Sequence, residues 1–226
     1  MNHAYNCYLL TVLPPLGEPG ATPPLSPIEL RARAIGSDGA ALVDAILLQE
    51  DLRLRQSYLA GEIPAPAPTV LSSEEVTSPA APVVLGVEQG DPRALRPEEQ
   101  VWEAYWRHVA RVARRRRSAL LSDWCGLEVA LRNALARARS RASGSEARLP
   151  EVAAELARVE PMIDTAIAAW SGAPDPLAGF RSLLRLRWDW VTREEPRYTF
   201  SRDEVAAYAL KLMLLREWRR TMGVAA

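Results

Sequence analysis

The chain has 226 residues, of which 48% are hydrophobic and 25% charged, and this composition is typical of a globular protein with a buried core. Its 28 basic residues balance its 28 acidic residues, so it lacks the basic excess of most nucleic-acid-binding proteins. No run approaches the roughly 20 apolar residues of a membrane-spanning helix, and residues 8–13 are too short for a signal peptide. Cys7 and Cys125 show no metal or redox spacing, so we predict a cytoplasmic protein without direct membrane insertion.

The neutral total charge conceals a gradient along the chain. Residues 1–92 carry a net charge of −7, residues 93–148 carry +7, and residues 149–226 are neutral. A basic middle beside an acidic front either neutralises itself within the fold or recruits an acidic partner.

The first 60 residues predict an N-terminal helical segment. Residues 4–13 suit a short extended strand, and a buried helical turn is equally compatible with so short an apolar run. The residues from Ser26 to Glu29 resemble a capping box with proline at the first helical position, which predicts a short helix that Gly36 stops. A second helix is expected from about residue 38 to residue 60, either buried on two sides or broken near Gln49.

Residues 61–96 differ from the rest of the chain in composition. They contain six prolines and no aromatic residue, so we expect them to bury little apolar surface. This pattern predicts a mobile or extended proline-rich connector between the N-terminal segment and a helical body at residues 97–226. The body and residues 1–60 are expected to form one compact domain.

Residues 97–142 predict an antiparallel helical hairpin. Pro97 followed by two acidic residues is typical of a helix N-terminus, and this helix ends in four arginines. Ser118 caps the next helix after almost no loop. Apolar residues then recur at steps of three and four, so one face of this second helix should be buried. The predicted core residues on this face are Trp124, Leu127, Leu131 and Leu135.

The C-terminal part predicts three further helical regions. Pro150 is expected to start a helix that Pro161 splits at Glu160. Residues 177–192 form the next helix, and residues 201–222 form the last, with a capping box at Ser201 and Glu204. The predicted core residues of these two helices are Trp188, Tyr208 and Leu212. Because almost every predicted element is helical, we assign an all-α fold built on a helical-hairpin bundle.

The residues that carry chemistry are sparse. His3 is close to one end of the sequence, and His108 has no second metal ligand at a suitable spacing. No glycine-rich loop follows a strand, and no serine lies in a nucleophile-elbow pattern. Cys125 is more typical of a small apolar core residue than of a nucleophile. We therefore predict no catalytic residue, no metal site and no cofactor.

A run of four arginines, Arg114 to Arg117, is the strongest local charge feature. Cations at a helix C-terminus complement the helix dipole, and a solvated helix end explains the run without any partner. A surface for an acidic protein is the functional alternative, and nucleic acid is disfavoured because binding needs more than one basic turn. Trp190 joins the candidates because Trp188 and Trp190, two residues apart, cannot share a helix face. The candidate interface comprises Arg111, Arg114, Arg115, Arg116, Arg117, Arg137, Arg139, Arg141 and Trp190.

Four blocks of the sequence resemble a bacterial family of unknown function that is associated with V/A-type ATPase operons. Residues 5–16, YNCYLLTVLPPL, are similar to the aromatic-leucine-proline opening of that family. The pattern W-x-x-L-E-x-x-L-R-N-x-L follows at residues 124–135, and LRWDW follows at residues 186–190. The fourth block spans residues 200–218 and includes AYALKL. The blocks keep the family's order, whereas residues 61–96 and the arginine run do not match it.

That family resembles a shortened form of the C subunit of V/A-type ATPases, which is also called the d subunit. The resemblance implies an all-helical, non-catalytic component of the ATPase that binds no nucleotide. It also implies a place between the central stalk and the membrane rotor ring, with the proteins of both as partners and a location peripheral to the membrane. Two other classes remain open on composition alone: a helical adaptor or regulator unrelated to the ATPase, and an enzyme with a dispersed site.

Overall fold

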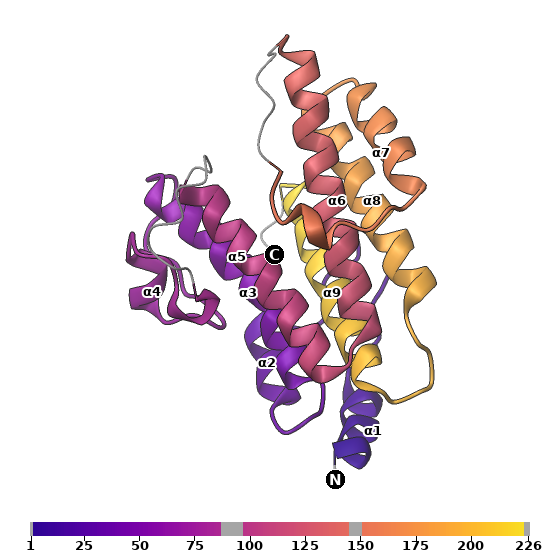
Figure 1. Cartoon of the computed structure of the whole chain (residues 1–226). Coiled ribbons are helices and arrows are strands. Elements are labelled where there is room, and N and C mark those ends of the chain that lie inside the picture. The colour runs from indigo at the N-terminus through magenta and orange to yellow at the C-terminus, as the bar shows by residue number, and fades with distance from the viewer. Residues whose placement is uncertain (1, 87–96, 145–150, 224–226) are drawn as a thin grey trace.

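The computed structural model describes residues 2–86, 97–144 and 151–223, and all regular structure in these ranges is helical (Figure 1). This confirms the predicted all-α fold. The elements are α1 Asn2–Val12, α2 Pro27–Ala34, α3 Ala40–Leu59, α4 Ser73–Thr77, η1 Val83–Leu85, α5 Pro97–Arg116, α6 Ala119–Ala142, η2 Ala154–Leu156, α7 Met162–Ser171, α8 Pro176–Glu194 and α9 Arg202–Arg220. None of the described helices is long and apolar enough to cross a membrane.

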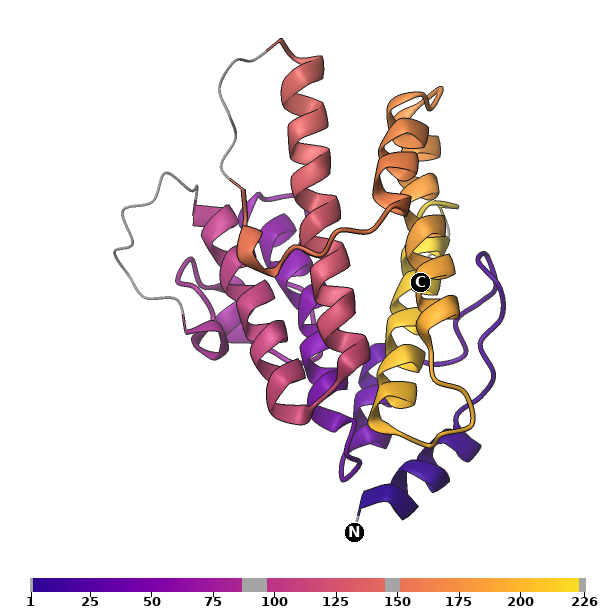
Figure 2. The same cartoon turned by 45° about the vertical axis from the view of Figure 1, so that its right-hand side comes forward.

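Of the two alternatives for residues 4–13, the extended strand is wrong and the helical one is observed, because residues 2–12 form helix α1 across the base of the molecule (Figures 1 and 2). Leu9 is 1% exposed, while Tyr8 on the same helix is 62% exposed. The Asn6 side chain is also buried and accepts a hydrogen bond from the backbone N–H of Asp38 at 3.2 Å. A helix satisfies its own backbone groups while one face is buried, whereas an isolated strand would leave both edges unpaired.

The α5–α6 hairpin forms as the sequence predicts (Figure 2). Arg117 takes a left-handed conformation with φ of 50° and reverses the chain direction. The Ser118 N–H then donates to the carbonyl of Ala113 at 2.9 Å, and the Ser118 hydroxyl accepts from the N–H of Leu121 at 3.1 Å. The turn therefore uses few residues and satisfies groups at both helix ends.

Helix α3 is continuous past Gln49 and is buried on two sides, which decides between the two readings of its apolar pattern. It packs against α5 on one side and α9 on the other, while α6 and α8 also pack against α9. Its buried apolar residues are Leu42, Val43, Ala45, Ile46, Leu47, Leu48 and Leu52. Helices α3 and α9 thus form the centre of the bundle.

Residues 61–86 are packed against α3, which differs from the expected connector. Leu71, Val76 and Leu85 are buried in the main core. The carboxylate of Asp51 accepts the N–H groups of residues 69–71 at 2.6–2.8 Å. Arg55 donates to the carbonyls of residues 78–80 at 2.9–3.0 Å. Two charged side chains of α3 therefore supply hydrogen-bond partners to a proline-rich backbone that forms few hydrogen bonds of its own. The rest of the predicted connector, residues 87–96, lies outside the described residues.

The predicted helix from Pro150 is also wrong for the described residues 151–160, where only the short turn η2 is helical. The Asn133 amide donates to the carbonyl of Val152 at 3.1 Å and accepts its N–H at 3.0 Å. These bonds replace a helical hydrogen-bond ladder. Pro161 therefore does not split a helix as expected but directly precedes one, since α7 begins at Met162.

Helix α9 begins at its predicted N-cap, but the capping box is incomplete. The Ser201 hydroxyl accepts the N–H of Glu204 at 3.3 Å. The Glu204 carboxylate reaches further back and accepts the N–H groups of Tyr198, Thr199 and Phe200. Tyr198 and Phe200 have positive φ, which turns these N–H groups towards one acceptor.

Candidate functional site

The arginine run occupies the tip of the α5–α6 hairpin. The side chains of Arg114 to Arg117 are all exposed. Within the described ranges, no carboxylate lies within ion-pair distance of any of these four guanidinium groups. The nearby Arg202 instead donates to the backbone carbonyl of Arg116 and lies 3.9 Å from the Asp38 carboxylate. The tip is therefore a positively charged end of the α5–α6 hairpin without an acidic partner among the described residues.

Arg111 lies one turn before the tip and is only partly exposed. It faces the same side of α5 as His108, whose pKa is lowered by burial and by the charge of Arg111. A lowered pKa keeps this imidazole neutral at physiological pH. His108 therefore adds no charge to the basic tip.

The predicted interface does not form one continuous patch. Arg137, Arg139 and Arg141 lie in the last turns of α6, while the arginine run precedes its first turn. A 24-residue helix is about 36 Å long, and this length separates the two groups. Arg137 pairs with Glu151 at 2.7 Å, and the guanidinium of Arg139 lies 5.5 Å from the ring centre of Trp170. Basic residues that are grouped by the charge pattern of the sequence therefore lie at opposite ends of α6.

Trp190 does not lie on the surface, which corrects its assignment to the interface. It is 1% exposed and packs against Trp124, with ring centres 5.7 Å apart. Trp188 is also buried, on another side of α8, where the ammonium of Lys211 lies 5.3 Å from its ring centre. The two rings therefore contact different helices, Trp190 meeting α6 and Trp188 meeting α9.

The remaining predicted core residues lie inside the bundle or at its edge. The buried ones are Trp124, Leu127, Leu131, Leu135, Trp188 and Leu212. Tyr208 is partly buried and donates its hydroxyl to the carbonyl of Pro14 at 2.8 Å. Burial raises the pKa of Tyr208 to about 12, so the phenol keeps its proton and this hydrogen bond at neutral pH.

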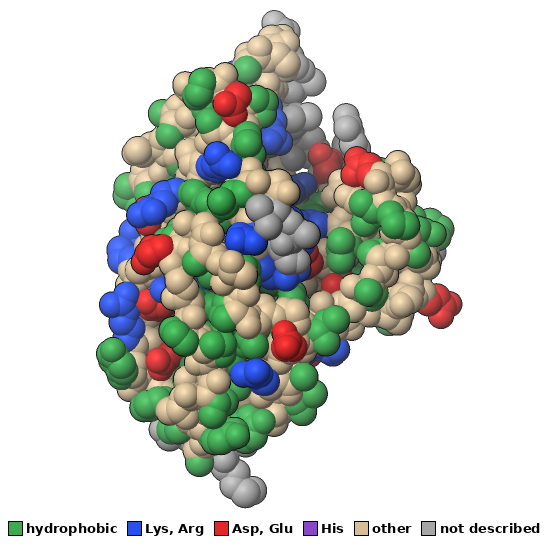
Figure 3. All heavy atoms as spheres, turned by 180° about the vertical axis from the view of Figure 1, so that it is seen from behind, with side chains coloured by type: hydrophobic (Ala, Val, Ile, Leu, Met, Phe, Trp, Pro, Cys, Tyr) green, Lys and Arg blue, Asp and Glu red, His purple; other side chains and the backbone are tan. Residues whose placement is uncertain are grey.

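A set of ion pairs joins the central helices, and sequence reasoning missed it. Glu50 and Arg53 on α3 pair with Arg220 and Glu217 on α9. Glu128 on α6 pairs with Arg187 on α8 through both carboxylate oxygens. Seen from behind, basic side chains gather in a hollow between the lobe that carries α4 and the C-terminal helices (Figure 3). The acidic residues that interrupt the apolar faces of α3 and α6 were the sequence signal that could have predicted these ion pairs.

A cavity of about 340 Å³ adjoins these ion pairs. Trp102 and Trp106 line one side of it, and Arg132 lies over the Trp102 ring at 5.5 Å. Burial lowers the pKa of Arg132, and the neighbouring Glu99 opposes that shift. The cavity combines cations with aromatic surface but contains no serine, cysteine or histidine side chain in its lining.

The thiol of Cys125, which lies in the core, is held in its unreactive protonated form. Burial raises the pKa of the Cys125 thiol to about 12, and its sulfur lies 3.5 Å from the carbonyl of Trp106. A protonated, buried thiol is a poor nucleophile. Among the described residues, no group of three or more histidine, cysteine, aspartate or glutamate side chains is arranged to hold a metal ion.

The chain matches no protein-family model, no curated protein and no solved structure.

Proposed function

We propose that this chain is a non-catalytic structural component of a V/A-type ATPase, similar to the C subunit of such enzymes, that links the central stalk to the membrane rotor ring. The proposal starts from the four sequence blocks that resemble the ATPase-associated family. Its binding element is the arginine tip of the α5–α6 hairpin, which would dock against acidic loops of a neighbouring protein in the complex. Such rim charges mainly steer association and set its salt dependence.

The packing of the four blocks supports treating them as one unit. The first and fourth blocks meet where Tyr208 donates to Pro14, although 194 residues separate them. The second and third blocks meet where Trp124 packs against Trp190. Residues that resemble one family therefore lie together in one core. A close-packed helical core of this kind transmits strain between its ends, which suits a protein that carries torque.

The unpaired side chains of Arg114 to Arg117 are the observation that supports a protein partner. Four exposed guanidinium groups at the end of a short, hydrogen-bonded turn repel one another, and the described part of the chain gives them no carboxylate. An acidic partner would remove this repulsion. The short turn fixes their backbone positions, so little backbone entropy would be lost on binding.

The decisive experiment is an affinity pull-down from the native cell, read by mass spectrometry. We expect ATPase central-stalk or rotor-ring subunits to be recovered at low salt and to be lost as salt rises. Replacing Arg114, Arg115 and Arg116 with glutamate should reduce this recovery at least tenfold, because attraction becomes repulsion. The purified chain alone should hydrolyse no ATP.

The matched control replaces Arg137, Arg139 and Arg141 with glutamate, which changes the net charge equally at the other end of α6. This variant should retain the partner. Equal loss with both variants would overturn the assignment of binding to the hairpin tip. Recovery of one soluble partner from an unrelated pathway would instead establish the alternative, a helical adaptor or regulator.

A further inference from the structure

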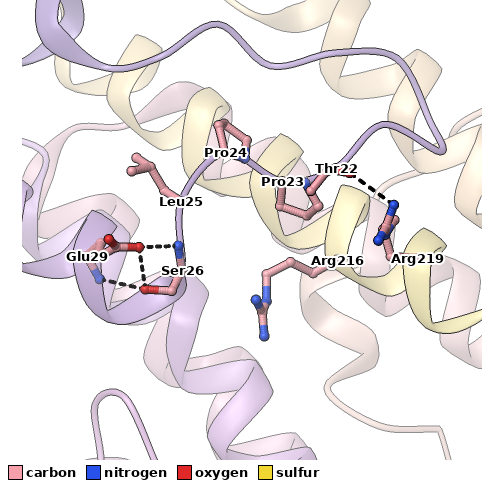
Figure 4. Close-up of a pocket in the computed structure, with 8 residues that line it drawn as sticks. All are labelled: Thr22, Pro23, Pro24, Leu25, Ser26, Glu29, Arg216 and Arg219. Atoms are coloured by element: carbon pink, nitrogen blue, oxygen red, sulfur yellow. Dashed lines mark hydrogen bonds between the residues drawn. The ribbon is translucent and has the colours of Figure 1, made fainter. Parts of the chain in front are cut away.

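A second basic feature lies far along the chain from the arginine tip, where the end of α9 meets the loop before α2. A pocket of about 270 Å³ opens to the surface here. Arg216 extends from α9 into the space beside this loop, and Arg219 reaches Thr22 (Figure 4). The residues that line the pocket are Thr22, Pro23, Pro24, Leu25, Ser26, Glu29, Arg216 and Arg219.

Arg216 is the unexplained group in this pocket. It makes no hydrogen bond or ion pair with any described residue, and its Nε atom is buried without an acceptor. Burial lowers the pKa of this guanidinium, while Glu50 nearby raises it. A buried donor without an acceptor is costly, and a charged one more so. An anion bound in the pocket would give the charge of Arg216 the partner that no described residue supplies.

Two further groups add to the anion-binding character of the pocket. Arg219 donates from Nη1 to the Thr22 hydroxyl at 3.0 Å, and its own Nε is also buried without an acceptor. Because the Thr22 oxygen accepts this bond, its hydroxyl hydrogen remains able to donate to a ligand. Two cations and one hydroxyl therefore face a small space.

The single carboxylate that lines the pocket, Glu29, is hydrogen-bonded to a neighbouring lining residue. Glu29 accepts hydrogen bonds from the N–H and the hydroxyl of Ser26, both at 2.8 Å. These two bonds, the backbone one first, lower the pKa of Glu29, so it stays ionised and caps α2. The lining keeps a net charge of +1 among the described residues.

We propose that this pocket binds a small oxyanion such as inorganic phosphate, with Arg216 as the main ligand-binding side chain. Arginine suits this role because its planar donors match phosphate oxygens in pairs. The volume is slightly below the range of about 300–1,000 Å³ typical of pockets for drug-sized ligands, which favours a single small anion over a nucleotide. The site is independent of the proposed ATPase role.

The test is thermal unfolding of the purified chain with increasing phosphate against chloride at matched ionic strength. Phosphate should raise the midpoint by about 2 °C or more and the effect should saturate, because a ligand that binds only the folded state stabilises it. Arg216→Gln should weaken the apparent affinity about tenfold or more. Thr22→Val removes one pocket hydroxyl and the acceptor of Arg219 but keeps both cations, so it should weaken the affinity by a smaller factor.

Arg114→Gln is the control, because it removes one exposed arginine without touching the pocket. It should respond to phosphate like the wild type. A response that never saturates, or that is the same in all four proteins, would show a general salt effect and overturn the site. A response lost in Arg114→Gln and kept in Arg216→Gln would overturn it as well, since phosphate would then bind the hairpin tip.

Discussion

Two irregular segments of this protein each form backbone hydrogen bonds with a polar side chain of a long helix, but the chemistry of that side chain differs. Residues 69–71 donate three N–H groups to the charged carboxylate of Asp51 on α3. Val152 exchanges a pair of hydrogen bonds with the neutral amide of Asn133 on α6. The charged anchor serves three residues, whereas the neutral anchor serves one.

Each anchor is accompanied by a second contact: Arg31 of α2 donates to the carbonyl of Thr69 at 2.8 Å, and the segment at Val152 lies close against Gly126. Gly126 on α6 lets the segment approach, because a Cβ atom there would lie 2.7 Å from the Cβ of Arg158. The Gly126 carbonyl then accepts the N–H of Arg158 at 3.1 Å. A carboxylate gathers several donors at the cost of desolvating a charge. An amide avoids that cost but needs a close-fitting backbone.

The largest expected effect comes from removing the charged anchor. Asp51→Ala leaves three N–H groups without their acceptor, two of them in residues packed on the core, so it should lower the free energy of unfolding by about 3–5 kcal/mol. Denaturant unfolding measures this loss. Limited proteolysis should also cut the variant, but not the wild type, between residues 69 and 80.

The control for this prediction is Asp44→Ala on the same helix. Asp44 is 42% exposed and pairs with Arg31 at 2.8 Å. An exposed pair of this kind contributes at most about 1 kcal/mol. If the two variants lose similar free energies of unfolding, the three backbone hydrogen bonds of Asp51 stabilise the fold no more than an exposed ion pair does.

A smaller effect is expected from the neutral anchor. Asn133→Ala removes one donor and one acceptor from the backbone of Val152, and both groups are buried. The free energy of unfolding should fall by about 1–3 kcal/mol. Hydrogen exchange of the Val152 amide should rise more than that of amides within α6. A loss larger than that of Asp51→Ala would reverse the comparison between the two anchors.

The smallest expected effect is a difference in how stability depends on pH. Only the carboxylate of Asp51 titrates, whereas the amide of Asn133 does not. Burial raises the pKa of Asp51 above its ordinary value of 3.8, and the hydrogen bonds from residues 69–71 oppose this shift without cancelling it. The folded state therefore binds the proton more tightly than the unfolded state does. The Asp51 contribution to stability falls as pH rises from about 3.8 through the raised pKa.

Denaturant unfolding of the wild type and Asp51→Asn between pH 3 and pH 7 measures this difference. The stability advantage of the wild type should be larger in acid and smaller at neutral pH. The opposite trend would show that the three hydrogen bonds outweigh burial.

Local signals in the chain were sufficient for most helix starts and for the all-α class. Ser26 and Ser118 each cap a helix through an acceptor a few residues from its donor, so the pattern is readable in sequence. The short turn at Arg117 and the start of α7 directly after Pro161 are local in the same way. The apolar stripe of α6 likewise follows from helical periodicity.

Tertiary packing decided the features that depend on distant partners. Glu50 pairs with Arg220 across 170 residues, and Asp51 orders a proline-rich segment about 20 residues away. Trp190 is buried and packs against Trp124, which lies on another helix. The length of α6 separates basic residues that the charge pattern had joined. In each case a residue's partner lies beyond the few positions that helical periodicity connects, so its environment depends on how the helices pack.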